Sequence, residues 1–130
     1  MDMKLELVPI PVADVDRAKA FYADQLGFHV DVDVRPADGV RVVQLTPPGS
    51  ACSIGIGSGI PVYEAPPGSI RGLHLVVDDI EKARAELIGR GVDVGEIQDV
   101  GRGVTYAGFE DPDGNGWTLQ LMPWRTGDAF

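Results

Sequence analysis

Two short patterns recur in this chain at the same offset, and this repetition constrains the fold more than any other feature of the sequence. Residues 14–18 (DVDRA) match residues 79–83 (DIEKA), and residues 46–50 (TPPGS) match residues 111–115 (DPDGN). Both offsets are 65 residues, half of the 130-residue chain. Acidic helix caps and Pro-Gly turns are common in α+β domains. Two independent matches at one offset nevertheless indicate two copies of one structural unit.

Hydrophobic periodicity predicts the same element order, βαβββ, in each copy. In the first copy we expect a strand at 5–12, a helix at 14–26, and strands at 28–35, 40–45 and 52–56. In the second copy we expect a strand at 73–77, a helix at 79–90, and strands beginning at 92, at 104–109 and at 117–121. The fold class is therefore α+β, in one domain over residues 1–130. Unit 1 spans about 1–56, a linker rich in Gly and Pro spans 57–71, and unit 2 spans about 72–123.

Residue types at the element ends support these boundaries. Asp14 and Asp79 are suited to cap the two helices. Pro9 and Pro11 donate no backbone hydrogen bond, so the first strand must lie at an edge or pair irregularly. Residues 28–35 alternate apolar with polar side chains, which is typical of a half-buried strand.

Composition narrows the function classes. The chain has 11 Lys and Arg against 20 Asp and Glu, a net charge of −9. This balance argues against nucleic acid and anionic membranes as partners and leaves neutral or cationic small molecules. No apolar run reaches the ~20 residues that a membrane helix needs. Cys52 is the single cysteine, which excludes an intrachain disulfide and suits a cytoplasmic protein. We expect Cys52 to face the core beside Ile54 and Ile56.

Four segments are specific in combination: residues 12–18 leading into Phe21-Tyr22, then 26–28 (LGF), 76–80 (VVDDI) and 111–115 (DPDGN). Together they resemble the vicinal oxygen chelate superfamily, which includes glyoxalases, extradiol dioxygenases and bleomycin-resistance proteins. The resemblance implies that the two units form a cup-shaped mixed sheet with the helices outside. It also implies one ligand cavity, and units that pair within one chain or between two chains of a homodimer.

Alternation along the strands predicts which side chains face that cavity. If Trp117 and Leu119 are core residues, Thr118 and Gln120 face the cavity. On the first strand, Leu7 and Pro9 face it. The 65-residue offset then makes Ser53 and Gly55 the counterparts of Thr118 and Gln120, and Gly72 and His74 those of Leu7 and Pro9.

The resemblance also implies where a divalent metal would bind in catalytic members, on the first and last strands of each unit. The matching positions here are Leu7, Ser53, Gly72 and Thr118. None offers a carboxylate or an imidazole, and a shift by two residues recovers only His74 and Gln120. Because a stable site needs several strong donors, we expect neither a metal nor another cofactor.

Other side chains remain open to two interpretations. His74 is either a cavity hydrogen-bonding group or general base, or a strand histidine satisfied by the backbone. His29 lies with Asp31 and Asp33 either on a solvated face or on an acidic wall suited to a cationic ligand. Gln44 is a lone polar residue in an apolar strand. Tyr63, Tyr106 and Trp124 either contact an apolar ligand or simply pack. The candidate ligand-binding residues are His74, Gln120, Thr118, Leu7, Ser53, Gln44, Tyr106 and Trp124; no residue is assigned as catalytic.

The leading functional hypothesis is a metal-free small-molecule-binding protein that sequesters a drug or metabolite. One alternative is a metal-free isomerase or cyclase that uses His74 with Gln120 or Tyr106. Another is a metal-dependent lyase, isomerase or dioxygenase, which the superfamily includes and the mapped residues contradict. A dimer with a purely structural role is the fourth hypothesis.

Overall fold

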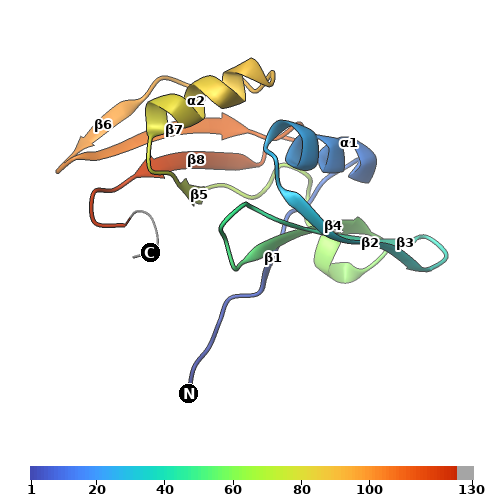
Figure 1. Cartoon of the computed structure of the whole chain (residues 1–130). Helices are drawn as coiled ribbons and strands as arrows, with labels where there is room; N and C mark the ends of the chain where they lie inside the picture. Colours follow the sequence, from blue (N-terminus) through green and yellow to red (C-terminus); the bar gives the residue numbers. More distant parts are fainter. Residues whose placement is uncertain (126–130) are drawn as a thin grey trace. The chain divides into compact units, whose positions relative to one another are not determined.

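The computed structural model describes residues 1–125, which form two compact units. Of these residues, unit 1 comprises Met1–Ile70 together with Pro112–Asn115, and unit 2 comprises Arg71–Asp111 together with 116–125. Each unit has one four-stranded mixed sheet with a helix packed against it (Figure 1). The α+β fold of two βαβββ units is confirmed.

The sheet of unit 1 has the strand order β1-β4-β3-β2. Strand β1 pairs with β4 in parallel, and the other neighbours are antiparallel. The elements are β1 (Leu7–Pro9), α1 (Val15–Ala20), the π-helical turn η1 (Phe21–Gln25), β2 (His29–Ala37), β3 (Val40–Thr46), β4 (Ser53–Ser58) and the 3₁₀ turn η2 (Pro61–Tyr63). Strand β1 is shorter than predicted, which agrees with the irregular pairing expected from its prolines.

Unit 2 repeats this arrangement with the order β5-β8-β7-β6. Its elements are β5 (Leu73–Val76), α2 (Ile80–Gly89), β6 (Gln98–Gly101), β7 (Val104–Glu110) and β8 (Gly116–Leu121). The predicted caps are confirmed, because Asp14 accepts a hydrogen bond from the Arg17 amide and Asp79 accepts one from the Lys82 amide. No helix within residues 1–125 is long and apolar enough to cross a membrane.

The prediction that a strand begins at residue 92 is wrong. Gly91 has a φ of 88° and ends α2 in the left-handed conformation. The amides of Gly91 and Val92 then donate to the carbonyl oxygens of Ile88 and Leu87, which is the Schellman pattern of a helix end. Val92 and Val94 are buried without strand pairing, and the strand starts only at Gln98.

The strand predicted at residues 28–35 is present as β2, but the prediction that it is half-buried is wrong, because a β-bulge divides the strand. Val30 pairs with Leu45 and Val32 with Gln44, so Asp31 is the extra residue. Beyond the bulge, Asp33 shares a face with buried Val43, and the valines move to the opposite face. Val32 and Val34 are 37% and 48% exposed, so most of β2 is exposed rather than half-buried.

The helix-facing side of each sheet carries the core, as alternation predicts. In unit 1 it includes Ile54, Ile56, Val43 and Leu45; in unit 2 it includes Trp117, Leu119, Ala107 and Phe109. The ring of Trp117 stacks on Phe109 with centroids 6.2 Å apart, so Trp117 is a core residue as expected. Cys52 lies before β4 and is only half-buried, which corrects its assignment to the core.

The loop between β7 and β8 belongs to unit 1, where Asn115 holds two backbone segments. Its Nδ2 donates to the carbonyl oxygen of Pro11 (2.9 Å), and its Oδ1 accepts from the amide of Ile70 (3.1 Å). Asn115 has no exposed surface. In the same loop, Asp113 accepts hydrogen bonds from the Ala13 amide (3.3 Å) and Arg17 (3.0 Å). The DPDGN sequence therefore serves the fold.

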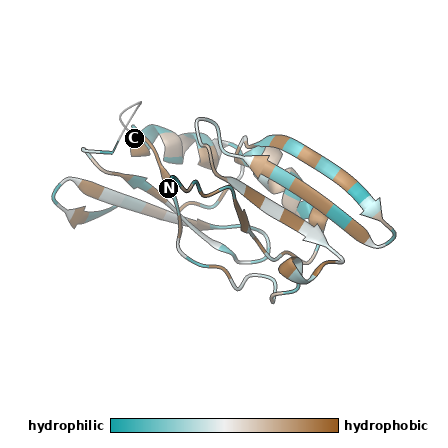
Figure 2. Cartoon of the chain, turned by 90° about the horizontal axis from the view of Figure 1, so that it is seen from below, coloured by the Kyte–Doolittle hydropathy of each residue, from teal (hydrophilic) through white to brown (hydrophobic). Residues whose placement is uncertain are grey.

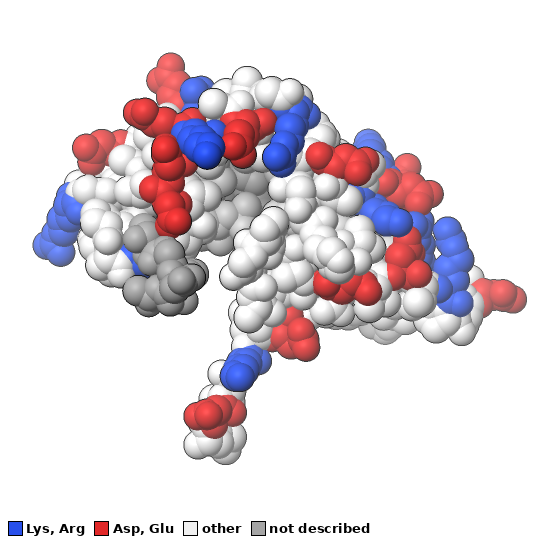
Figure 3. Space-filling view, viewed as in Figure 1, with Lys and Arg blue, Asp and Glu red and all other residues white. Residues whose placement is uncertain are grey.

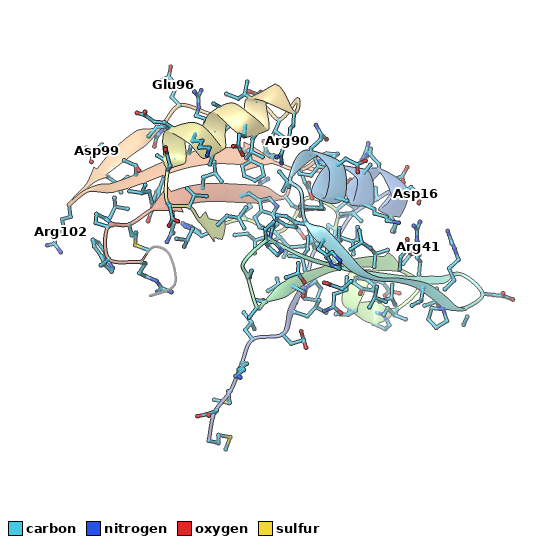
Figure 4. The ribbon with its side chains drawn as sticks, viewed as in Figure 1. Asp16, Arg41, Arg90, Glu96, Asp99 and Arg102 are labelled. Atoms are coloured by element: carbon cyan, nitrogen blue, oxygen red, sulfur yellow. The ribbon has the colours of Figure 1, made fainter. Side chains whose placement is uncertain are left out.

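A charged cluster joins α1 to the β2–β3 ribbon. The buried Arg41 donates to Asp33 through two nitrogens (3.1 and 3.0 Å) and to Asp16, and Lys19 donates to Asp33 (2.7 Å). Acidic and basic side chains lie side by side over this part of the surface (Figure 3), and Figure 4 shows Asp16 beside Arg41. Hydrogen bonds from Arg41 and Lys19 hold the pKa of the Asp33 carboxyl well below its ordinary value.

Replacing Asn115 by aspartate should lower the free energy of unfolding by about 2–4 kcal/mol, because a buried carboxylate oxygen would face the Pro11 carbonyl. Urea unfolding at pH 7 measures the change. Gln98→Glu makes the same amide-to-acid change on the exposed strand β6 and should change stability little. Equal effects of the two variants would contradict the structural role of Asn115.

Replacing Asp33 by asparagine should lower stability at pH 7 by about 1 kcal/mol, because the ion pairs with Arg41 and Lys19 are lost. Since the pKa of Asp33 is lowered in the folded state, its contribution is full above the unfolded pKa of about 4 and declines as the pH falls below it. The difference between wild type and variant should therefore narrow in acid, measured by thermal unfolding from pH 7 to pH 2. Asp38→Asn, at the exposed β2–β3 turn, is the control; a constant Asp33→Asn effect over this range would refute the assignment.

Candidate ligand-binding site

Four of the predicted site residues gather on the sheet face of unit 2 that points away from α2. Trp117 and Leu119 of β8 are buried on the helix side, so Thr118 and Gln120 lie on the other face. His74 pairs with Thr118, and Tyr106 pairs with Gln120. Strands β5, β8 and β7 thus bring their polar and aromatic side chains together on this face.

His74, Gln120 and Tyr106 are in contact, and we call them the His74 cluster. The distance from His74 Nδ1 to Gln120 Oε1 is 2.6 Å. The rings of His74 and Tyr106 meet edge to face, with centroids 5.4 Å apart and an interplanar angle of 83°. Gln120 is buried, whereas His74 is exposed. The partner of His74 is a side chain rather than the backbone, which favours the interpretation of this histidine as a hydrogen-bonding group of the site.

The strand pairing corrects the correspondence between the two units. Leu7 pairs with Ser53 and His74 with Thr118, so His74 is the counterpart of Leu7; the prediction of Gly72 for that position is wrong. Gly72 has a φ of 82°, a left-handed conformation that a β-strand does not adopt, and β5 begins only at Leu73. A strict 65-residue offset therefore cannot hold for β5 and β8 together, because it would pair Gly72 with Thr118, whereas His74 pairs with Thr118.

In unit 1, the predicted residues Leu7, Ser53 and Gln44 also share the sheet face opposite the helix. Leu7 pairs with Ser53, and Gln44 pairs with Gly55. The ring of Tyr63 packs on this face: a Cβ built at Gly57 would lie 2.5 Å from Tyr63 Cε2, and one at Gly55 would lie 3.2 Å from its hydroxyl. Burial raises the pKa of the Tyr63 hydroxyl. Part of this face is thus covered by the chain's own aromatic side chain, which is one of the two interpretations open for Tyr63.

A chain of hydrogen bonds crosses the same face from Ser53 to the edge strand. The hydroxyls of Ser53 and Thr46 are 2.6 Å apart, Thr46 donates to Asp31, and His29 Nδ1 lies 2.9 Å from Asp31. Hydrogen bonds from Thr46 and His29 lower the pKa of Asp31. Asp33 faces Arg41 instead. The bulge therefore separates the two carboxylates, and the acidic wall considered for His29, Asp31 and Asp33 does not form.

Trp124 lies beyond the end of β8 and is 59% exposed, so its role in the ligand site stays a prediction. A shallow surface depression of about 420 Å³ in unit 2 is lined by Asp93, Gly95, Gly108, Phe109, Glu110 and Trp117.

Sequence analysis missed Gly108, which pairs with Thr118 beside the cluster. The available signal was a glycine inside a predicted strand, where the missing side chain leaves the sheet face open beside Thr118.

The donor groups at the mapped metal positions do not fit a divalent ion. With the corrected pairing these positions are Leu7, Ser53, His74 and Thr118, which together supply one imidazole, two neutral hydroxyls and no carboxylate. Within residues 1–125, no three His, Cys, Asp or Glu side chains gather where they could hold a metal. Stable metal binding requires several such donors.

Comparison with known proteins identifies the class of protein that this fold and site define. The family model of the Glyoxalase/Bleomycin resistance protein/Dioxygenase superfamily matches residues 4–119, and the chain belongs to this superfamily. No curated protein sequence gave a significant match.

Among solved structures, the chain is similar to TnmS3, an antibiotic binding protein from Streptomyces sp. CB03234. The two share 35% identity with a TM-score of 0.80, over 92% of this chain and 96% of TnmS3. A glyoxalase/bleomycin resistance protein from the same organism shares 36% identity with a TM-score of 0.75, over 89% and 98% of the two chains. A superfamily member from Sphaerobacter thermophilus DSM 20745 shares 30% identity with a TM-score of 0.80, over 93% and 98%.

The purified protein should contain no stoichiometric Zn, Ni, Mn or Fe, because the mapped positions lack the donors that retain these ions. Elemental analysis measures the content, and a thermal melt with and without EDTA should give the same midpoint. About one tightly held metal per chain, lost on chelation together with stability, would contradict this prediction.

Proposed function

We propose that this protein is a metal-free small-molecule-binding protein whose ligand binds on the face of the unit 2 sheet opposite α2. The observation that carries the proposal is the His74 cluster. In this cluster the exposed imidazole of His74 contacts both the buried amide of Gln120 and the aromatic ring of Tyr106. Binding sites typically combine apolar surface with a few polar groups that orient the ligand.

The cluster is suited to binding because its members are held in place. All three side chains project from paired strands, which position groups more rigidly than loops do. Gln120 is buried, and its oxygen contacts His74, so the imidazole has a defined neighbour. A ligand that contacts His74 and Tyr106 therefore meets a prearranged surface and loses less free energy to ordering of the protein.

The likeness to TnmS3 supports a drug-like ligand, since TnmS3 is described as an antibiotic binding protein. The net charge of −9 favours a neutral or cationic guest. Sequestration of an antibiotic or a related metabolite is the role that joins these two observations. The protein is proposed to act in the cytoplasm, where its single cysteine stays reduced.

The exposed imidazole favours one second candidate, a metal-free isomerase or cyclase in which His74 acts as a general base. Gln120 and Tyr106 are both neutral neighbours, so His74 would have to provide the base alone. A bound ligand recovered unchanged after prolonged incubation supports binding, and conversion to an isomer supports the enzyme.

Replacing His74 or Tyr106 by alanine should reduce ligand binding, because each variant removes one side of the cluster. A thermal-shift screen of small molecules identifies ligands, since any compound that binds the folded state raises the midpoint. For a confirmed ligand, we expect at least about tenfold weaker binding by each variant. His29→Ala, the other histidine and exposed on unit 1, is the matched control. Loss of binding in His29→Ala alone would place the ligand elsewhere.

We also propose a homodimer, because strand β2 is a sheet edge that exposes Val32 and Val34. Exposed edges and apolar side chains are commonly covered by association. Light scattering at micromolar concentration should report about twice the chain mass of 13.9 kDa. A mass near 13.9 kDa would refute the dimer and leave the ligand site untouched.

A further inference from the structure

We propose that Gln120 holds His74 in the tautomer protonated on Nδ1, so that Nε2 presents a lone pair and selects planar aromatic ligands that carry a hydroxyl group. The inference rests on the proposed function and adds the chemical class of the ligand. Its basis is the 2.6 Å contact between His74 Nδ1 and Gln120 Oε1. A side-chain amide oxygen only accepts hydrogen bonds, so Nδ1 must be the donor.

The consequence for Nε2 follows from the chemistry of imidazole. A neutral ring carries one proton, and when Nδ1 holds it, Nε2 is an acceptor. Gln120 is 7% exposed, which keeps its oxygen away from competing water. His74 itself is exposed, so the acceptor edge of its ring is available to a ligand. The site therefore favours a ligand that donates a hydrogen bond to His74 Nε2.

The surroundings of His74 favour a flat ligand. The Tyr106 ring stands at 83° to the imidazole and provides one apolar wall. Gly108, which pairs with Thr118 on the same face, has no side chain. A Cβ built at Gly108 would meet only the carbonyl oxygen of Trp117, at 3.7 Å. An open glycine beside an aromatic wall leaves room for a planar ring to lie against the strands.

The donor that fits this arrangement is an aromatic hydroxyl. It places an O–H in the plane of the ring, where it reaches Nε2 while the ring contacts Tyr106. A hydroxyl is neutral, so it is compatible with the net negative charge of the chain. An ether or a ketone of the same shape offers only hydrogen-bond acceptors. Its oxygen lone pair would face the lone pair of His74 Nε2, which is unfavourable.

The tautomer can be measured without any ligand. Long-range ¹H–¹⁵N correlation spectra at pH 8 distinguish a protonated from an unprotonated ring nitrogen, and the His74→Ala variant assigns the signals. We expect His74 to show protonated Nδ1 and unprotonated Nε2. In Gln120→Met, which keeps the side-chain length but removes the amide, the Nε2-protonated form should appear. An Nε2-protonated His74 in the wild type would overturn the proposal.

The ligand class is tested with 2-naphthol and 2-methoxynaphthalene, which differ in the donor and share the fused ring. Calorimetry with the wild type should show 2-naphthol binding about five- to tenfold more tightly, the factor expected of one net hydrogen bond. This preference should disappear in His74→Ala and shrink in Gln120→Met, and His29→Ala should retain it.

The outcomes separate this inference from the proposed function. Equal binding of both naphthalenes, or binding of other screened compounds but of neither naphthalene, overturns the hydroxyl preference and leaves the binding function standing. Failure of every compound in the screen to bind overturns the proposed function and this inference with it.

Discussion

Each four-stranded sheet buries one face under its own helix, and the period of two along a strand then assigns every side chain to one face or the other. In β8, Trp117 and Leu119 are buried on the helix side, so Thr118 and Gln120 lie on the opposite face of the sheet. Strands β5 and β7 add His74 and Tyr106 in register with them. The candidate site is thus a direct consequence of which residues the core requires. Strands of unit 1 show the same kind of alternation between hydrophobic and hydrophilic residues, at the right of Figure 2.

The sequence patterns that reveal the superfamily serve the fold rather than the ligand. Asp14 caps α1, and Asn115 binds the backbone at Pro11 and Ile70. These contacts use backbone groups that every member with this chain path must satisfy. The residues that would meet a ligand in the proposed site, such as His74 and Gln120, lie outside these patterns. For this reason the patterns predict the architecture and say little about the ligand.

Sequence reasoning predicted the element order, both helix caps and the shared face of Thr118 and Gln120, because these depend on local periodicity and capping. It could not predict the bulge at Asp31. The bulge moves the side chains that follow it to the opposite face of the sheet, but the alternation of apolar and polar residues in the sequence continues unchanged. It also misplaced the register of β5, because the left-handed Gly72 delays the strand. Sequence reasoning grouped His74 with Gln120, and the structure shows that their contact runs diagonally between β5 and β8, because His74 pairs with Thr118 and Val76 with Gln120.

Unit 1 and unit 2 share a topology but differ chemically on the corresponding faces. Unit 1 fills part of its face with Tyr63, and its polar groups, from Ser53 to His29, bond to one another. In unit 2 the exposed His74 makes its side-chain hydrogen bond with the buried Gln120. The two faces thus differ in what they offer a ligand. Tyr63 covers part of the unit 1 face, whereas on unit 2 an exposed imidazole, a buried amide and an aromatic ring are in contact, and this combination is the reason for placing the ligand on unit 2.

The most direct test of this account is a backbone amide titration of the ¹⁵N-labelled, metal-free protein with a ligand found by screening. Binding at the proposed face should shift most strongly the amides of His74, Tyr106, Gly108, Thr118 and Gln120, on three neighbouring strands of unit 2. The amides of α2, on the opposite side of the sheet, should shift least. Shifts centred on α2 or on unit 1, with these strand amides unchanged, would contradict the account.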